Sequence, residues 1–175
     1  MNVERNLALD DDQARKDALD VARSFIVQAP AGSGKTELLI QRYLCLLATV
    51  DNPEEVLAIT FTRKAAAEMR LRVVLALQRA ARGEAPDAAH EKITARAAKA
   101  VLVRDHEAGW DLIDNPRRMR VQTLDSLNAS IARMRPLTAG ATTGAATVDM
   151  AEMSALYRHA AAATLDWIGD DGGAG

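Results

Sequence analysis

The sequence predicts an α/β fold in which a parallel sheet is flanked by helices. Short runs of apolar and β-branched residues at 24–29, 56–61 and 119–123 predict three strands, of which the first two are expected to be buried. The longer segments between them repeat apolar residues at helical spacing, and the links between elements are short. Strands and helices that alternate in this way are typical of a parallel sheet.

Each helix has its own sequence signal. Asp10 or Asp11 can cap the first helix, and a leucine-rich segment after Gly34 forms the second. An apolar stripe identifies the third helix, in which the repeating residues are Ala66, Met69, Val73, Leu77 and Ala80. The expected helices cover residues 10–22, 35–48, 63–81, 87–104, 126–134 and 150–168.

The remaining segments are predicted to be connectors. Trp110 is expected to anchor the connector 109–116, and the stretch 136–147, rich in Gly, Ala and Thr, is expected to form a loop. The stretch 169–175, rich in Gly and Asp, is expected to be a flexible tail.

Composition excludes several classes of protein. The 175 residues are enough for one domain with a core. The chain has 22 basic and 24 acidic residues, so it is not basic overall, although a local basic patch is allowed. Aromatic residues make up 3%, too few for a broad platform that stacks many bases.

The sequence also bears on compartment. It has no apolar run long enough to span a membrane, and its first residues lack the pattern of a signal peptide. Its single cysteine, Cys45, cannot form an internal disulfide. We therefore expect a cytoplasmic protein without a membrane partner.

The strongest functional signal is the segment Ala29-Pro-Ala-Gly-Ser-Gly-Lys-Thr36, which follows a predicted strand and opens a helix. Gly32 and Gly34 allow the backbone to curl so that its N–H groups face a phosphate. Lys35 supplies a charge for the β- and γ-phosphates, and the Thr36 hydroxyl suits Mg²⁺. Although Ala29 replaces the first glycine of the usual pattern, the segment predicts a nucleotide-binding loop.

A second group of polar, aromatic and basic residues follows the second predicted strand. Between residues 63 and 82, six basic residues stand against one acidic residue, Glu68, which is a local excess of five positive charges. A phosphodiester backbone is a natural partner for this segment, and Phe61 could stack on a base. The alternative is a solvated helix face beside a core phenylalanine.

The phosphate loop and the segment Thr60-Phe-Thr-Arg-Lys-Ala-Ala-Ala-Glu-Met69 together resemble the first two motifs of superfamily 1 DNA helicases of the UvrD/Rep type. Segments at 24–29, 53–60 and 121–128 are similar to the RecB/AddA-like branch, the motor subunits of helicase–nucleases that process DNA breaks. The resemblance covers about residues 10–135. It implies a partial RecA-like P-loop domain that uses ATP and Mg²⁺, binds single-stranded DNA and works with a nuclease partner subunit.

The resemblance also implies roles for individual residues. Gln13 matches the glutamine that reads the adenine edge, and Glu68 and Met69 would secure their helix to the sheet. Lys35 and Thr36 would be catalytic, with Thr36 as the Mg²⁺ ligand. The implied triphosphate cradle is Ala31, Gly32, Ser33, Gly34, Lys35 and Thr36. The implied DNA contacts are Phe61, Thr62, Arg63, Lys64, Thr123 and Ser126.

The expected domain boundary lies near residue 136. Residues 1–136 would form the partial motor domain, with a helical insertion at about 84–112, and residues 137–175 a linker and the start of an inserted helical subdomain. An ATP motor also needs an acidic pair at a strand end, and no run of four apolar residues followed by Asp-Glu occurs. We therefore expect the amino-terminal piece of a larger helicase, which binds ATP but hydrolyses it poorly.

Two other functions share some of these features. A small-molecule phosphotransferase of the nucleotide-kinase type has the same loop, but it leaves the segment 60–69 unexplained. A non-catalytic remnant that serves as an interaction module is the second alternative.

Overall fold

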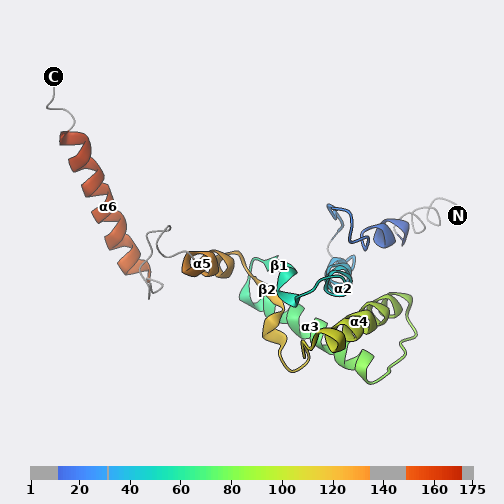
Figure 1. The fold of residues 1–175 in the computed structure, drawn as a ribbon. Helices are drawn as coiled ribbons and strands as arrows, with labels where there is room; N and C mark the ends of the chain where they lie inside the picture. The colour runs from blue at the N-terminus through green and yellow to red at the C-terminus, as the bar shows by residue number, and fades with distance from the viewer. Residues whose placement is uncertain (1–11, 31, 135–148, 171–175) are drawn as a thin grey trace, which may run out of the picture. The chain divides into compact units, whose positions relative to one another are not determined.

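The computed structural model describes residues 12–30, 32–134 and 149–170 (Figure 1). Contacts within the chain define two compact units, Met1–Asn128 and Ala129–Gly175. The loop predicted at 136–147 and the last five residues of the predicted tail lie outside the described residues. Within the described ranges, no helix is both long and apolar enough to cross a membrane.

Two strands form a small parallel sheet. Strand β1, Leu57–Thr60, pairs with β2, Arg120–Thr123, in a register that sets Thr60 opposite Thr123. The strands predicted at 56–61 and 119–123 are therefore confirmed. Together with the helices they give a mixed α/β fold that is consistent with a partial RecA-like domain.

The helix bounds follow the apolar periodicity closely. Helix α2 is Lys35–Leu47 and α3 is Arg63–Ala81, as expected. Helix α4 extends beyond its predicted end at residue 104, because Gly109, with a left-handed φ of 63°, is the residue that ends it. The other elements are α4 Ala89–Ala108, α5 Leu124–Met134, α6 Met150–Asp170, and the 3-10 turns η1 Pro53–Glu55 and η2 Pro116–Arg118.

The first helix is shorter than predicted. In the described part it covers residues 12–17, whereas the expected end was Ala22. The Asp20 carboxylate accepts a hydrogen bond from the N–H of Ala22 at 3.0 Å, and Arg42 donates to the carbonyl of Ala18. These side-chain bonds take the place of helical backbone bonds, so the helix ends early.

The strand predicted at 24–29 is wrong. The segment has no regular secondary structure, and in the described chain no ladder joins it to β1 or β2. The side chain of Ile26 is 100% exposed. β-Branched residues favour an extended backbone, but a strand forms only where a neighbour supplies hydrogen-bond partners and a packing surface.

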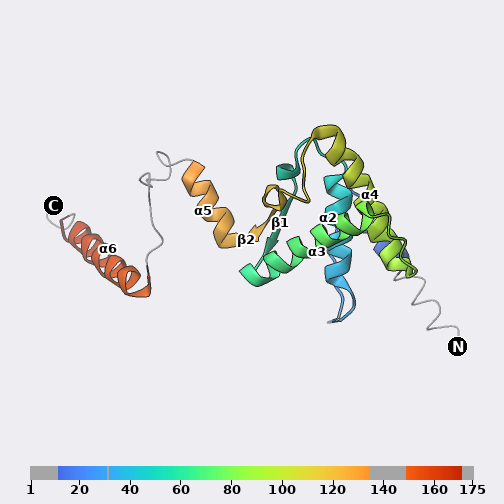
Figure 2. The ribbon, with the colours of Figure 1, turned by 90° about the horizontal axis from the view of Figure 1, so that it is seen from below.

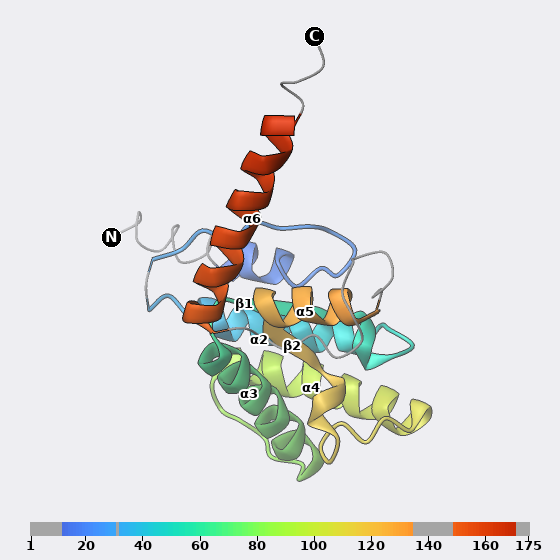
Figure 3. The same ribbon diagram turned by 90° about the vertical axis from the view of Figure 1, so that its left-hand side faces the viewer.

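The helices cover one face of the sheet. Helix α3 packs against both strands, and Figures 2 and 3 show α3 and α4 together on one side of them. Val121 of β2 is buried on the covered face, whereas Leu57 and Ile59 of β1 are exposed. The expectation that β1 is buried is therefore wrong, because alternate side chains of a strand point to opposite faces and only one face is covered.

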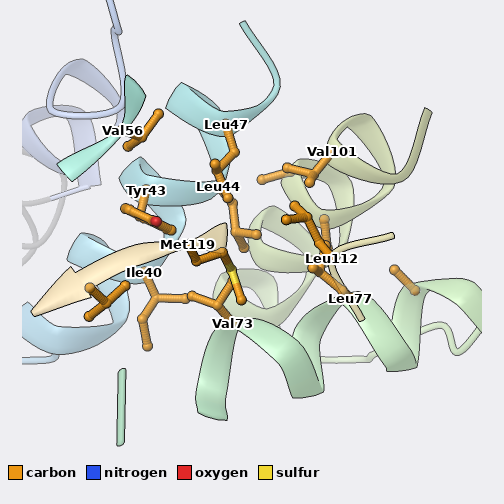
Figure 4. Packing of buried hydrophobic residues seen from close by; sticks show 14 of the residues in the cluster. Ile40, Tyr43, Leu44, Leu47, Val56, Val73, Leu77, Val101, Leu112 and Met119 are labelled. Atoms are coloured by element: carbon orange, nitrogen blue, oxygen red, sulfur yellow. The ribbon is translucent and has the colours of Figure 1, made fainter. Parts of the chain in front are cut away.

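Helices α2, α3 and α4 enclose the hydrophobic core (Figure 4). Side chains without exposed surface come from all three helices and from the connector that follows α4. They include Leu44, Leu47, Val73, Leu77, Val101 and Leu112. Burial raises the pKa of the Tyr43 phenol and of the Cys45 thiol, so both groups are neutral at pH 7.

The connector after α4 is anchored by Trp110, as predicted. This side chain is buried, and the Arg104 guanidinium lies 6.0 Å from the centre of its ring. Arg104 also donates to the carbonyl of Val50 at 2.9 Å. Trp110 and Arg104 together therefore hold the connector next to Val50, which precedes the turn before β1.

The buried face of α3 can be tested with two leucines. Leu77→Ala should destabilise the protein by about 2–5 kcal/mol, because it removes a fully buried side chain and leaves a cavity. Leu71→Ala on the same helix, where the side chain is 57% exposed, should cost less than about 0.5 kcal/mol. Urea unfolding followed by circular dichroism measures both values. Equal losses would contradict the assignment of this face.

Candidate functional site

The loop before α2 curls through two left-handed glycines. Gly32 and Gly34 have φ values of 79° and 78°, which residues with a Cβ rarely adopt. The Ser33 hydroxyl donates to the carbonyl of Pro30 at 2.8 Å. The first backbone hydrogen bond of α2 runs from the N–H of Leu38 to the carbonyl of Gly34. The N–H groups of residues 35–37 therefore have no acceptor within the helix. Such a turn can bind an anion.

The Lys35 ammonium lies over this loop. Its Nζ donates to the carbonyls of Ala29 and Pro30, which hold the charge at the start of the loop. Thr36 is exposed, so its hydroxyl is accessible to a metal ion. Ala31, which was predicted to be part of the cradle, lies outside the described residues.

Two arginines that no sequence pattern marked connect this region: Arg15 ties the first helix to the loop, and Arg42 ties the turn after that helix to α2. Arg15 donates through Nη2 to the carbonyl of Ser33. Arg42 of α2 donates to the carbonyl of Asp20 at 3.0 Å and to that of Arg23 at 2.7 Å. Their partners are backbone carbonyls far away in the sequence, which leave no trace in residue spacing.

Gln13, the predicted adenine reader, lies on the same short helix. Its Nε2 donates to Oδ1 of Asp17 at 2.8 Å, so reading a base requires this bond to open. A hollow of about 300 Å³ lies beside the helix, and its lining includes Ala14, Arg15, Phe25, Val27, Lys35 and Leu38. The role of Gln13 stays a prediction.

The strand register brings the second predicted group of residues to one edge of the sheet. Thr60 and Thr123 are the last pair of the parallel ladder. The residues that follow them therefore begin next to each other at one end of the sheet. Phe61 is 100% exposed, which rules out the alternative that it is a core residue. Arg63 and Lys64 are exposed as well.

Hydroxyl groups at this edge cap the helices that begin there. Thr62 Oγ1 accepts a hydrogen bond from the third N–H of α3 at 3.1 Å. Thr123 Oγ1 accepts one from the N–H of Ser126 at 3.2 Å and lies 2.8 Å from its Oγ. Because Thr123 is only 6% exposed, its side chain faces the protein. The DNA contacts assigned to these three residues stay predictions.

The predicted basic segment is not a uniform solvated face. Arg70 donates to a carbonyl of β2 and thus links α3 to the sheet. Arg72 pairs with Glu68 at 2.6 Å, and Arg82 pairs with Glu84 at 2.8 Å. These arginines are partly neutralised or structural, which leaves the first turn of α3 as the strongest candidate for a phosphate contact.

The role predicted for Glu68 is wrong. Glu68 is bonded to Arg72 one turn later on the exposed side of α3, so it does not secure the helix to the sheet. Met69 is half-buried against the core, as predicted. Arg70 makes the bond to the sheet that was expected of Glu68.

The family model of the UvrD/REP helicase N-terminal domain matches residues 10–168. The match includes the phosphate loop, both strands and the helices that follow them. No solved structure matches the chain significantly.

Several larger proteins contain a segment similar to this chain. An ATP-dependent helicase/nuclease subunit from Desulfitobacterium hafniense is 42% identical over 83 residues, which are 46% of this chain and 6% of that protein. The protein of the same name from Levilactobacillus brevis is 38% identical over 82 residues, 47% of this chain and 6% of its own length. DNA helicase II of Salmonella typhimurium is 48% identical over 61 residues, 34% of this chain and 8% of its own. The matched part is thus under a tenth of each relative.

The curled loop can be tested at Gly34. Gly34→Ala should destabilise the protein by about 1–2 kcal/mol, because alanine is strained at positive φ. A Cβ at this position would meet Arg15 Nη1 at 3.6 Å, an ordinary contact, so the cost comes from the backbone. Gly34→Asn should lose less stability than Gly34→Ala, since asparagine tolerates this backbone conformation better. If both variants unfold in urea like the wild type, this backbone geometry is refuted.

Proposed function

The chain belongs to the UvrD/Rep helicase family, and from that premise we propose that residues 29–36 bind the triphosphate of ATP with Mg²⁺ and that the edge after β1 binds single-stranded DNA. The observation that carries the proposal is the glycine loop with the Lys35 ammonium beside it.

The residues of the loop fit a triphosphate. Apart from Gly32 itself and its two chain neighbours, no atom of the described residues lies within 4 Å of the position that a Cβ of Gly32 would take, so a phosphate can approach the backbone closely. The N–H groups of the first helical turn would donate to its oxygens, and Lys35 would exchange its carbonyl partners for the β- and γ-phosphates. Thr36 would hold Mg²⁺, which neutralises charge between the phosphates.

The edge after β1 fits a single strand of nucleic acid. Phe61 offers an exposed ring on which a base can stack, and Arg63 and Lys64 beside it can contact the phosphates. Ser126, which is bonded to Thr123 at the end of β2, would be a further hydrogen-bond donor to the nucleic acid. Stacking and charge give affinity without base specificity, which suits a protein that must bind any sequence.

For the whole protein we propose a motor that moves along DNA and works with a nuclease partner, since two of the relatives are named as helicase/nuclease subunits. Residues 1–136 would be part of a RecA-like motor domain and residues 137–175 the start of an inserted helical subdomain. We further propose that residues 1–175 hydrolyse ATP poorly, because they carry no Asp-Glu pair after an apolar run.

Nucleotide binding is tested by calorimetry with Mg²⁺ and ATP. Lys35→Ala should weaken binding at least about tenfold, because charge-assisted hydrogen bonds to phosphate are lost. Lys64→Ala removes the same charge away from the loop and should leave the affinity unchanged. No binding heat from a natively folded wild type would overturn the nucleotide proposal. Rapid phosphate release that Lys35→Ala abolishes would overturn the proposal of poor hydrolysis.

DNA binding is tested with a labelled oligothymidine in a salt titration. Phe61→Ala should weaken binding by about 1–3 kcal/mol, the value of one stacked base. Lys64→Ala should reduce the slope of log affinity against log salt by about 0.7, since one phosphate contact is lost. Arg79→Ala, at the other end of α3 and beside Glu84, is the matched control. If it weakens binding as much as Lys64→Ala does, the contacts are placed wrongly.

A further inference from the structure

A chain of polar side chains connects α2 to α4. Gln41 of α2 is 5% exposed, and its Nε2 donates to the carbonyl of His90 at 2.9 Å and to Thr94 Oγ1 at 3.1 Å. Thr94 Oγ1 donates to Oε1 of Glu37 at 2.6 Å. Glu37 lies in the first turn of α2, two residues after Lys35.

Chemistry fixes the direction of these bonds. The amide group of Gln41 has two hydrogens and uses both. The hydroxyl of Thr94 has one hydrogen, and the short contact to the Glu37 carboxylate takes it in preference to the 3.2 Å contact to the carbonyl of His90. Each N–H and O–H group of Gln41 and Thr94 in this network therefore has an acceptor. The network has one arrangement of hydrogen bonds instead of several of similar energy.

Within the described chain, Lys35 in the first turn of α2 bonds only to carbonyls of the loop itself, and no side chain of this turn before Leu38 is fully buried. The apolar side chains of α2 that enter the core begin at Leu38, whereas Lys35 and Glu37 are half-buried and Thr36 is exposed. Helix ends open more readily than helix centres, because fewer contacts restrain them. The Glu37–Thr94 bond thus restrains the turn that carries the phosphate-binding residues.

The hydrogen bond between Thr94 and Glu37 also orients the negative charge of Glu37. Glu37 is an acidic group close to a loop that is proposed to take a triphosphate, and like charges repel. The hydroxyl of Thr94 directs the carboxylate toward α4. Without it, the carboxylate could turn toward the loop and compete with the phosphates for the N–H groups of the helix start.

We propose that Thr94 and Gln41 are positioning residues for the phosphate loop, through which α4 fixes the first turn of α2 and the direction of Glu37. The effect on ATP affinity rests on the proposed nucleotide binding, whereas the effect on the order of the turn does not. Helix α4, which was predicted to be part of an insertion, is thereby a functional support of the site.

The test compares Thr94→Val, which keeps the shape and removes the hydroxyl, with Thr94→Ser, which keeps the hydroxyl. Amide hydrogen exchange of residues 38–40, whose N–H groups bond back to the first-turn carbonyls of α2, should be about tenfold faster in Thr94→Val and near the wild-type rate in Thr94→Ser. Amides at the centre of α3 should not change. Affinity for Mg²⁺-ATP should fall about fivefold to tenfold in Thr94→Val alone.

Glu37→Ala removes the other end of the bond, and exchange in the double variant Glu37→Ala/Thr94→Val should be no faster than in Thr94→Val. Unchanged exchange in Thr94→Val would overturn the proposal, as would faster exchange with unchanged ATP affinity. If the wild type itself binds no Mg²⁺-ATP, the proposed nucleotide site fails, and the exchange rates still decide whether Thr94 holds the turn.

Discussion

Burial of one face of α2 is the constraint on which the candidate site depends. Leu44 and Leu47 have no exposed surface and are held among α3, α4 and the connector after α4. A loop with two glycines has many backbone conformations available and loses much entropy when it is ordered. It becomes a defined cradle because it ends in a helix that cannot move. The motif therefore provides the chemistry, and the leucines behind it provide the geometry.

Arginine side chains join segments that the small core does not reach. A planar guanidinium with five N–H groups can bind several carbonyls at once. Arg42, Arg70 and Arg104 each donate to a backbone carbonyl of a segment distant in the sequence. Arg118 donates both to the carbonyl of Trp110 at 3.3 Å and to Glu54, and its hydrogen bond to Glu54 lowers the pKa of the Glu54 carboxyl. Positive charge in this chain is therefore a poor guide to a nucleic-acid surface until each cation is seen with its partners.

Local patterns predicted what local forces decide. The apolar spacing of α3 gave its bounds, and the glycine-lysine segment gave the start of α2, since both depend on nearby residues. Distant partners decided the rest. Residues 24–29 have strand-forming side chains but no neighbour to pair with in the described chain. The exposure of Phe61 and the bonds of Arg15 and Arg42 likewise depend on the folded arrangement, which spacing does not encode.

The parallel register of β1 and β2 has a mechanical consequence. The ladder bonds of β1 and β2 run across the strands, so tension applied along one strand loads them together in shear. Bonds sheared together resist rupture better than bonds that unzip one after another. Arg70 adds a cross-link from α3 to β2 behind the same edge. A pulling force applied at Phe61 is thus transmitted to β2 and α3 instead of stretching one loop.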